Sequence, residues 1–206
     1  IDATKDLVCA YKPNLAFYRE AAGKQVLELS IRYIREVAPD VVVILDAKQA
    51  DIGNTNDGYV GEDFGYYNAH AVTVHPYLGM EAMRPLLDRA DKGIIVLCRT
   101  SNPGAGEFQD LRVTLTGDPD KLYDYTEHEV PLYQIVARNI ATNWNYNGNC
   151  AVVVGATYPG ELAEVRRIVG NMPILIPGIG AQGGDLEATV LAGRNSHNQG
   201  MIINSS

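Results

Sequence analysis

Apolar runs of strand length alternate along the chain with amphipathic segments. Runs in which Val, Ile and Leu follow one another without polar interruption are typical of parallel strands covered on both faces. Apolar positions at helical spacing separate these runs and predict helices at residues 25–38, 80–90, 129–144 and 160–170. The strands are predicted at residues 7–12, 41–48, 71–77, 93–100, 150–157, 173–179 and 199–205.

Strands and helices in alternation indicate an α/β fold built from right-handed crossovers, either a TIM (β/α)8 barrel or a doubly wound sheet. A closed barrel of this class has eight strands. We therefore predict a TIM barrel whose first strand and C-terminal helix would lie before Ile1 and after Ser206. An open sheet of the predicted strands is the alternative. No repeat or linker interrupts the pattern, so residues 1–206 are predicted to form a single barrel domain.

The longest segment without periodicity is residues 101–128, which contains several glycines. Long loops of this kind in a compact domain are often functional. We expect this segment to cross one end of the barrel and to act as a lid.

The composition narrows the class of protein. The 206 residues are 46% hydrophobic with a net charge of -8, which fits a globular protein and excludes a general binder of nucleic acid or anionic membrane. No apolar run reaches the roughly 18 residues of a membrane span, and no signal peptide is found. Cys9, Cys98 and Cys150 lack metal or disulfide spacing, which indicates reduced core thiols in a cytoplasmic protein.

Charged residues gather directly after the apolar run of residues 41–45. Alternation along a strand through residue 48 would place Asp46 and Lys48 on one face, and Asp51 follows just beyond. Lys12, at the end of the first strand, adds a second cation. Burying such charges unpaired would cost several kcal/mol per ion, on the order expected for desolvated ions, so we predict the chemistry here.

A glycine-rich turn follows the strand at residues 173–179. The glycines from Gly178 to Gly184 precede a predicted helix that begins near Asp185 and Glu187. Glycine amides and a helix N-terminus together favour an anion, and barrels often bind phosphate in this region. His75, before a proline at a strand end, has either a structural or a catalytic role. No spacing of histidines and carboxylates predicts a metal site.

The motif D-x-K-x-x-D-I-x-x-T, at residues 46–55, resembles the signature of the orotidine 5'-phosphate decarboxylase family. The loop PGIGAQGGD at residues 177–185 is similar to the phosphate loop of that family. Lys12-Pro13-Asn14, the T-S-N-P-G stretch at residues 100–104 and the closing I-I-N-S-S at residues 202–206 resemble its bacterial branch.

The resemblance implies a homodimeric TIM barrel that converts orotidine 5'-monophosphate to uridine 5'-monophosphate and CO2 in pyrimidine biosynthesis, without metal or cofactor. Lys48 would donate the proton to C6, with Asp46 near the substrate carboxylate. Asp51, Ile52 and Thr55 would reach into the partner's site, and Lys12 and Asn14 would hold the ribose and the charge network. Thr100 and Ser101 would contact the pyrimidine or its neighbourhood. The base and phosphate would be held by Pro177, Gly180, Gln182 and Gly183. The family also has an acidic residue ending its first strand, which would lie before Ile1, and a phosphate-binding arginine, expected directly after Ser206.

Two other functions stay open on the residues alone. Magnesium-dependent 3-keto-L-gulonate 6-phosphate decarboxylases and hexulose-phosphate synthases share D-x-K-x-x-D, although the 177–185 loop and Thr55 favour the orotidine interpretation. A nucleotide-binding barrel without catalytic activity is the third hypothesis.

Overall fold

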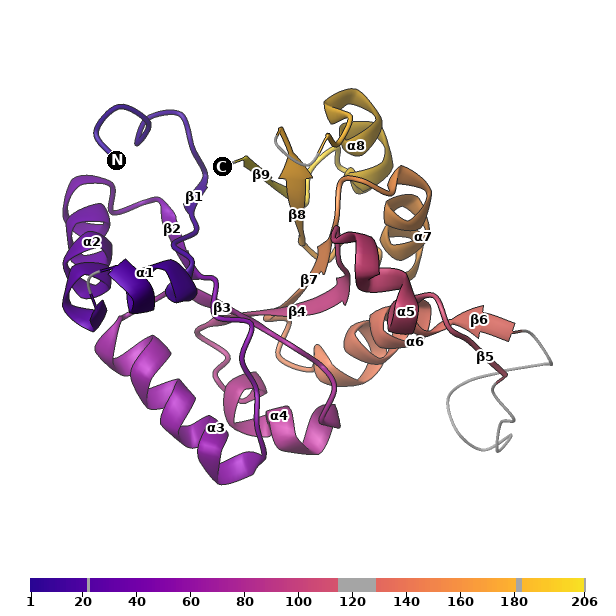
Figure 1. Cartoon of the computed structure of the whole chain (residues 1–206), viewed down its shortest axis with the longest axis horizontal. Helices are drawn as coiled ribbons and strands as arrows, with labels where there is room; N and C mark the ends of the chain where they lie inside the picture. The colour runs from indigo at the N-terminus through magenta and orange to yellow at the C-terminus, as the bar shows by residue number, and fades with distance from the viewer. Residues whose placement is uncertain (22, 115–128, 181–182, 206) are drawn as a thin grey trace. The chain divides into compact units, whose positions relative to one another are not determined.

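The computed structural model describes residues 1–21, 23–114, 129–180 and 183–205 (Figure 1). The chain divides into two compact units. Unit 1 comprises residues 1–97 and 143–152, and unit 2 comprises residues 98–142 and 153–206. Strands β4 (Gly93–Arg99) and β7 (Cys150–Val154) each contribute residues to both units. The single domain predicted from the sequence stays a prediction.

In unit 1, parallel strands follow one another in the order β1-β2-β3-β4-β7. The register pairs Ala10 with Val42, Ile44 with Ala71, and Ala71 with Gly93. The first three strands are β1 (Ala10–Tyr11), β2 (Val42–Leu45) and β3 (Ala71–Val74). The helices of this unit are α1 (Leu15–Ala21), α2 (Gly23–Val37), α3 (Gly53–Val60), the π-helix η1 (Gly61–Tyr66) and α4 (Gly79–Leu87).

In unit 2, the ends of β4 and β7 are followed by the parallel pair β8 (Ile174–Ile179) and β9 (Met201–Ser205). A short antiparallel hairpin of β5 (Arg112–Thr114) and β6 (Glu129–Pro131) accompanies them (Figure 1). The helices are the 3-10 turn η2 (Pro103–Ala105), α5 (Gly106–Gln109), α6 (Leu132–Asn139), the π-helix η3 (Ile140–Trp144, which ends in unit 1), α7 (Pro159–Val169) and α8 (Leu186–Gly193).

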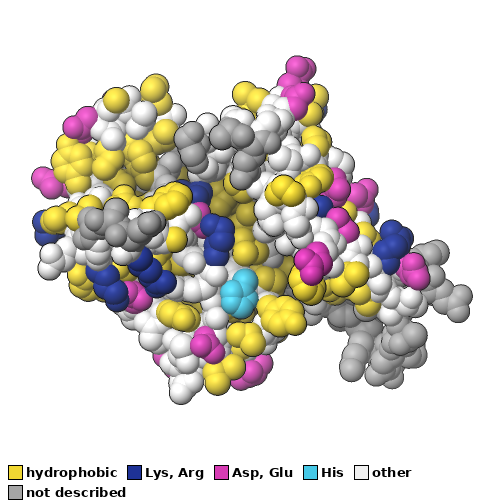
Figure 2. All heavy atoms as spheres, in the orientation of Figure 1, with side chains coloured by type: hydrophobic (Ala, Val, Ile, Leu, Met, Phe, Trp, Pro, Cys, Tyr) yellow, Lys and Arg dark blue, Asp and Glu magenta, His cyan; other side chains and the backbone are white. Residues whose placement is uncertain are grey.

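Helix α2 shows how the apolar pattern builds the core of unit 1. Leu27, Ile31 and Ile34 recur at helical spacing and are buried. Large hydrophobic side chains also remain on the surface of the N-terminal segment and α2, as Figure 2 shows in yellow, among them Leu7 and Leu29.

Among the described helices, none has the length and apolar content needed to cross a membrane.

Arg166 holds the amino ends of the unit 2 strands. This buried side chain has no acidic partner among the described ion pairs and donates instead to four carbonyl oxygens at 2.6–2.8 Å. Burial lowers the pKa of its guanidinium. The carbonyls belong to Gly170 and Met172 before β8, Gly193 at the end of α8, and Gly200 before β9.

The structure confirms most predicted elements and corrects four details. Of the strand predicted at 7–12, only the two residues of β1 are in a strand, and the strand predicted at 41–48 ends at Leu45. In the segment predicted as a helix at 129–144, the first three residues form strand β6 and the helix starts only at α6. Pro131 is the N-cap of α6, because it lacks the N–H that an internal helix position needs. The described part of the predicted loop 101–128 contains η2, α5 and β5. Residues 115–128, the second half of the predicted lid, lie outside the described residues.

Two apolar residues predicted to be buried are exposed. Val42 is 41% exposed because it lies at the amino end of β2, beside a β1 of only two residues. Cys9 precedes β1 in the same edge region and is exposed as well. Cys98 and Cys150 are buried free thiols, as predicted, and burial raises the pKa of each to about 12.

Candidate functional site

Asp46 follows β2 directly, and its backbone is fixed on both sides by the segment after β1. The Asp46 N–H donates to the Pro13 carbonyl at 2.9 Å, and the Asp46 carbonyl accepts from Leu15 N–H at 3.2 Å. Asn14 and Asp46 form an isolated parallel bridge. These contacts bring Lys12 and Asp46 together, although 34 positions separate them in the sequence.

The Asp46 carboxylate is buried and binds two ammonium groups. Lys12 Nζ lies 2.6 Å from Oδ2, and Lys48 Nζ lies 2.5 Å from Oδ1. The Thr73 hydroxyl donates to Oδ1 at 2.9 Å, and Asn14 Nδ2 lies 3.5 Å from Oδ2. Burial raises the pKa of Asp46, but the hydrogen bonds and charges of the two lysines outweigh it and leave this pKa below its ordinary value. Asp46 is therefore ionised at neutral pH.

Lys48 is the part of this network that faces solvent, since its side chain is 47% exposed. Its backbone has φ 50°, in the left-handed region that side chains other than glycine rarely occupy. The predicted strand alternation through residue 48 is therefore wrong, because the extended backbone ends at Leu45. The pairing of Lys48 with Asp46 comes from this left-handed turn, which Lys48 N–H stabilises by donating to Thr73 Oγ1 at 3.0 Å.

Gln49, the next residue, holds a buried carboxyl group. Its Nε2 donates to both oxygens of Asp63 in η1, at 3.1 and 2.9 Å. Asp63 has no exposed surface, and desolvation raises its pKa to about 7. The Gln49 hydrogen bond and the charge of Arg19 oppose that rise, whereas Glu62 adds to it.

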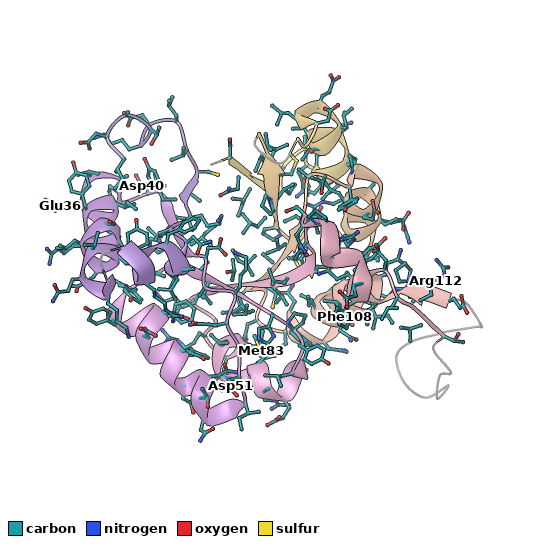
Figure 3. All side chains as sticks on the ribbon, in the orientation of Figure 1. Glu36, Asp40, Asp51, Met83, Phe108 and Arg112 are labelled. Atoms are coloured by element: carbon teal, nitrogen blue, oxygen red, sulfur yellow. The ribbon has the colours of Figure 1, made fainter. Side chains whose placement is uncertain are left out.

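Asp51 is held by backbone contacts and makes no ion pair with Lys48 within the described residues. Its carboxylate accepts from the Ile52 N–H at 2.7 Å. The buried Asn56 side chain accepts from Asp51 N–H at 2.9 Å and donates to the carbonyls of Asp51 and Ala82. Figure 3 shows Asp51 near α4, the helix that carries Met83. Ile52, 58% exposed, and Thr55, also exposed, have their side chains free for contact with another molecule.

Thr100 and Ser101, in unit 2, follow β4. Gln109 in α5 accepts from Thr100 N–H at 2.8 Å and donates to the Thr100 hydroxyl at 2.9 Å. The preceding Arg99 is 2% exposed, forms an ion pair with Asp110 at 3.0 Å, and lies over the Tyr158 ring at 4.3 Å. Helix α5 is thereby attached to the strand end.

The glycine-rich turn after β8 also lies in unit 2. Gly180 and Gly183 have φ 87° and 78°, a conformation that favours glycine, and Gly183 N–H donates to the Gly180 carbonyl at 2.8 Å. Asp185 caps α8 by accepting from Ala188 N–H at 3.0 Å. Pro177 lies in β8 before this turn, whereas Gln182 lies outside the described residues.

Sequence reasoning missed several polar residues that organise the site. Thr73, Gln49, Asp63, Asn56 and Gln109 all contact predicted site residues or their neighbours. Thr73 carried a usable signal, because it is the one hydroxyl residue inside the apolar run AVTV of β3. The other four lie in irregular or weakly amphipathic segments. His75, predicted to have either a structural or a catalytic role, has a buried Nδ1 without a hydrogen-bond partner among the described residues.

Comparison with known proteins gives one consistent result. The family model described as "Orotidine 5'-phosphate decarboxylase / HUMPS family" matches residues 1–206. Proteins named orotidine 5'-phosphate decarboxylase from a Janthinobacterium species and from Cupriavidus metallidurans are 50% and 52% identical to this chain, over all of it and 71% of their own length.

Solved structures give the same likeness. The structure of Leishmania donovani UMP synthase matches with a TM-score of 0.87 and 40% identity, over 100% of this chain and 43% of that one. Leishmania donovani OMP decarboxylase matches with a TM-score of 0.82 and 40% identity, over 96% of this chain and 71% of that one. Together with the parallel strand order within each unit, this confirms the predicted TIM-barrel class over the open sheet.

Proposed function

This chain belongs to the orotidine 5'-phosphate decarboxylase / HUMPS family, and we propose that it converts orotidine 5'-monophosphate to uridine 5'-monophosphate and CO2 in pyrimidine biosynthesis. The single observation that carries the chemistry is the buried Asp46 carboxylate between two lysines, one of them open to solvent. A reaction that develops negative charge beside a fixed ammonium group suits this arrangement.

Lys48 would act as the proton donor. In the reaction the bond between C6 and the carboxylate carbon breaks, CO2 leaves, and the electron pair stays on C6. The Lys48 ammonium stabilises that carbanion and transfers a proton to it, and the amine then regains a proton from water. Asp46 holds the Lys48 ammonium at 2.5 Å, and would lie near the departing carboxylate. Lys12 completes the charge balance around Asp46.

The remaining predicted residues would bind the nucleotide. Asn14, beside Asp46, would hold the ribose together with Lys12. Thr100 and Ser101 would contact the pyrimidine. The residues after β8, which are Pro177, Gly180, Gln182 and Gly183, would hold base and phosphate. The left-handed glycines support that role, because they allow backbone N–H groups to approach an anion closely.

We further propose a cytoplasmic homodimer with shared active sites and no metal or cofactor. Asp51, Ile52 and Thr55 would reach the partner's site, which the exposure of Ile52 and Thr55 supports. Mixing Asp51→Ala with Lys48→Ala chains tests this, because hybrid dimers would contain one intact site. Failure to recover activity in verified hybrid dimers would contradict the shared site.

The deciding experiment is a decarboxylation assay on orotidine 5'-monophosphate with and without a strong chelator. Full activity with the chelator is expected. Loss of activity that magnesium restores would favour a metal-dependent sugar-phosphate decarboxylase instead. Tight uridine 5'-monophosphate binding without turnover would favour the non-catalytic barrel. Lys48→Ala should abolish turnover and preserve nucleotide binding, and substantial residual turnover would refute the role of Lys48.

A further inference from the structure

The Gln49–Asp63 pair is a buried polar contact that the proposed chemistry does not use. Gln49 Nε2 donates to both carboxylate oxygens of Asp63, at 3.1 and 2.9 Å, and Asp63 has no exposed surface. A carboxyl group placed there loses its hydration, and one carboxamide replaces little of it. Such a costly contact beside a reactive residue indicates a function other than stability.

The contact lies one residue from a strained backbone. Lys48 has φ 50°, which costs roughly 1–2 kcal/mol for a residue with a side chain. Strain of this kind persists only where neighbouring contacts enforce it. Thr73 fixes the Lys48 N–H from one side at 3.0 Å, and the Gln49 side chain fixes the following residue from the other.

The π-helix η1 supplies the anchor. Glu62 pairs with Lys24 of α2, and Ala69 N–H donates to the Asp63 carbonyl at 3.0 Å, so the main chain around Asp63 is held independently of Gln49. Insertions of a π-type turn are frequent at functional sites. Asp63 can therefore act on residues 48–49 as a fixed acceptor.

We propose that Asp63 is a positioning residue for the reaction: through the Gln49 carboxamide it holds Lys48 in the left-handed conformation that keeps its ammonium group on Asp46. This inference rests on the proposed decarboxylase function. It requires a hydrogen-bond acceptor at residue 63 and a donor at residue 49, and it does not require a charge at residue 63.

The test replaces each partner by an apolar residue of similar size in the full-length protein. Asp63→Leu and Gln49→Met should each lower kcat by about tenfold to a hundredfold, the range for a small misplacement of a reacting group. KM and the Kd for uridine 5'-monophosphate should change less than about threefold, because nucleotide contacts stay in place. The double variant should lose no more than either single one, since the two residues act as a unit. Asp63→Asn keeps an acceptor and should restore most of the kcat.

A matched control separates positioning from general loosening of η1. Phe64, the buried neighbour of Asp63, packs against Arg89 and Lys92 and does not contact Gln49 among the described interactions. Phe64→Leu should lower the melting temperature without lowering kcat. The backbone amide resonance of Lys48 should shift in Asp63→Leu and Gln49→Met and stay in place in Phe64→Leu.

The outcomes distinguish the two proposals. If the parent protein decarboxylates orotidine 5'-monophosphate and Asp63→Leu and Gln49→Met keep its kcat, the positioning role is overturned. A kcat loss in Phe64→Leu equal to theirs would overturn it as well. If the parent protein has no such activity, the proposed function fails, and the Lys48 amide resonance still decides whether the pair holds that residue.

Discussion

Replacing Asp63 by asparagine should stabilise the protein at alkaline pH. Burial raises the pKa of Asp63 from 3.8 to about 7, so the folded state binds this proton more tightly than the unfolded chain does. The stabilisation from that proton is complete below about pH 4 and is lost as the pH rises from about 4 to 7, because the unfolded state loses its proton first. Asparagine stays neutral throughout and removes this dependence.

The size of the effect follows from the shift of about three pKa units. At about 1.4 kcal/mol per unit, the folded protein would lose at most about 4 kcal/mol between pH 4 and pH 8 through this one group. Relaxation around Asp63 will reduce that figure. We therefore expect Asp63→Asn to be more stable than the parent by about 2–4 kcal/mol at pH 8 and equal to it near pH 4.

Urea unfolding at pH 4, 5, 6, 7 and 8 measures this, at one protein concentration because association also affects stability. Asp57→Asn on α3 is the matched control, since it makes the same substitution at an exposed carboxylate. Equal slopes for the parent and Asp63→Asn, or a less stable Asp63→Asn at pH 8, would refute the reasoning.

Three further changes test other contacts. Arg166→Met removes four hydrogen bonds from a buried guanidinium to backbone carbonyls and should lower the free energy of unfolding by about 3–5 kcal/mol, measured in urea; a loss below about 1 kcal/mol would contradict its role. Thr73→Val removes the hydroxyl that accepts from Lys48 N–H and donates to Asp46, and should lower kcat about tenfold in a steady-state assay; an unchanged kcat would argue against a positioning role for these two contacts. Gly155→Ala would place a Cβ 2.6–2.9 Å from three atoms of Ser101, two of them backbone, and should lower the free energy of unfolding by about 1–3 kcal/mol. A melting temperature equal to the parent's would contradict this, because it would mean that the backbone around Ser101 shifts to accommodate the Cβ without a loss of stability.

Periodicity alone predicted the regular part of the fold. Continuous apolar runs located β2, β3, β4, β7 and β8, because burial on both faces favours an uninterrupted apolar sequence in a parallel strand. The apolar run at β9 located that strand as well, although its residues are only half-buried or exposed. Helix α3 was missed because its sequence, GNTNDGYV, has glycines and few apolar residues, and tertiary contacts such as Asn56 to Ala82 stabilise it instead.

The site was predictable in its charges and not in its geometry. Asp46, Lys48 and Lys12 stood out because unpaired charges beside a buried strand need a reason. The left-handed turn at Lys48 carries no sequence signal, since lysine is not a residue that favours positive φ. Asp63 was equally hidden, because an acid within GEDFGY reads as a solvated surface residue until the fold buries it.

The contacts of Arg166 lie at one end of the unit 2 strands, so mutations at the two ends of these strands should affect different properties of the protein. It closes the amino ends of β8 and β9, whereas the glycine turn lies at the carboxyl end of β8. Changes around Arg166 should alter the stability of the protein and leave its substrate preference intact, whereas changes in the turn should alter ligand binding. Stabilising substitutions near Arg166 could therefore offset the stability lost when the turn is mutated to bind new ligands. This separation makes the unit a suitable starting point for directed evolution.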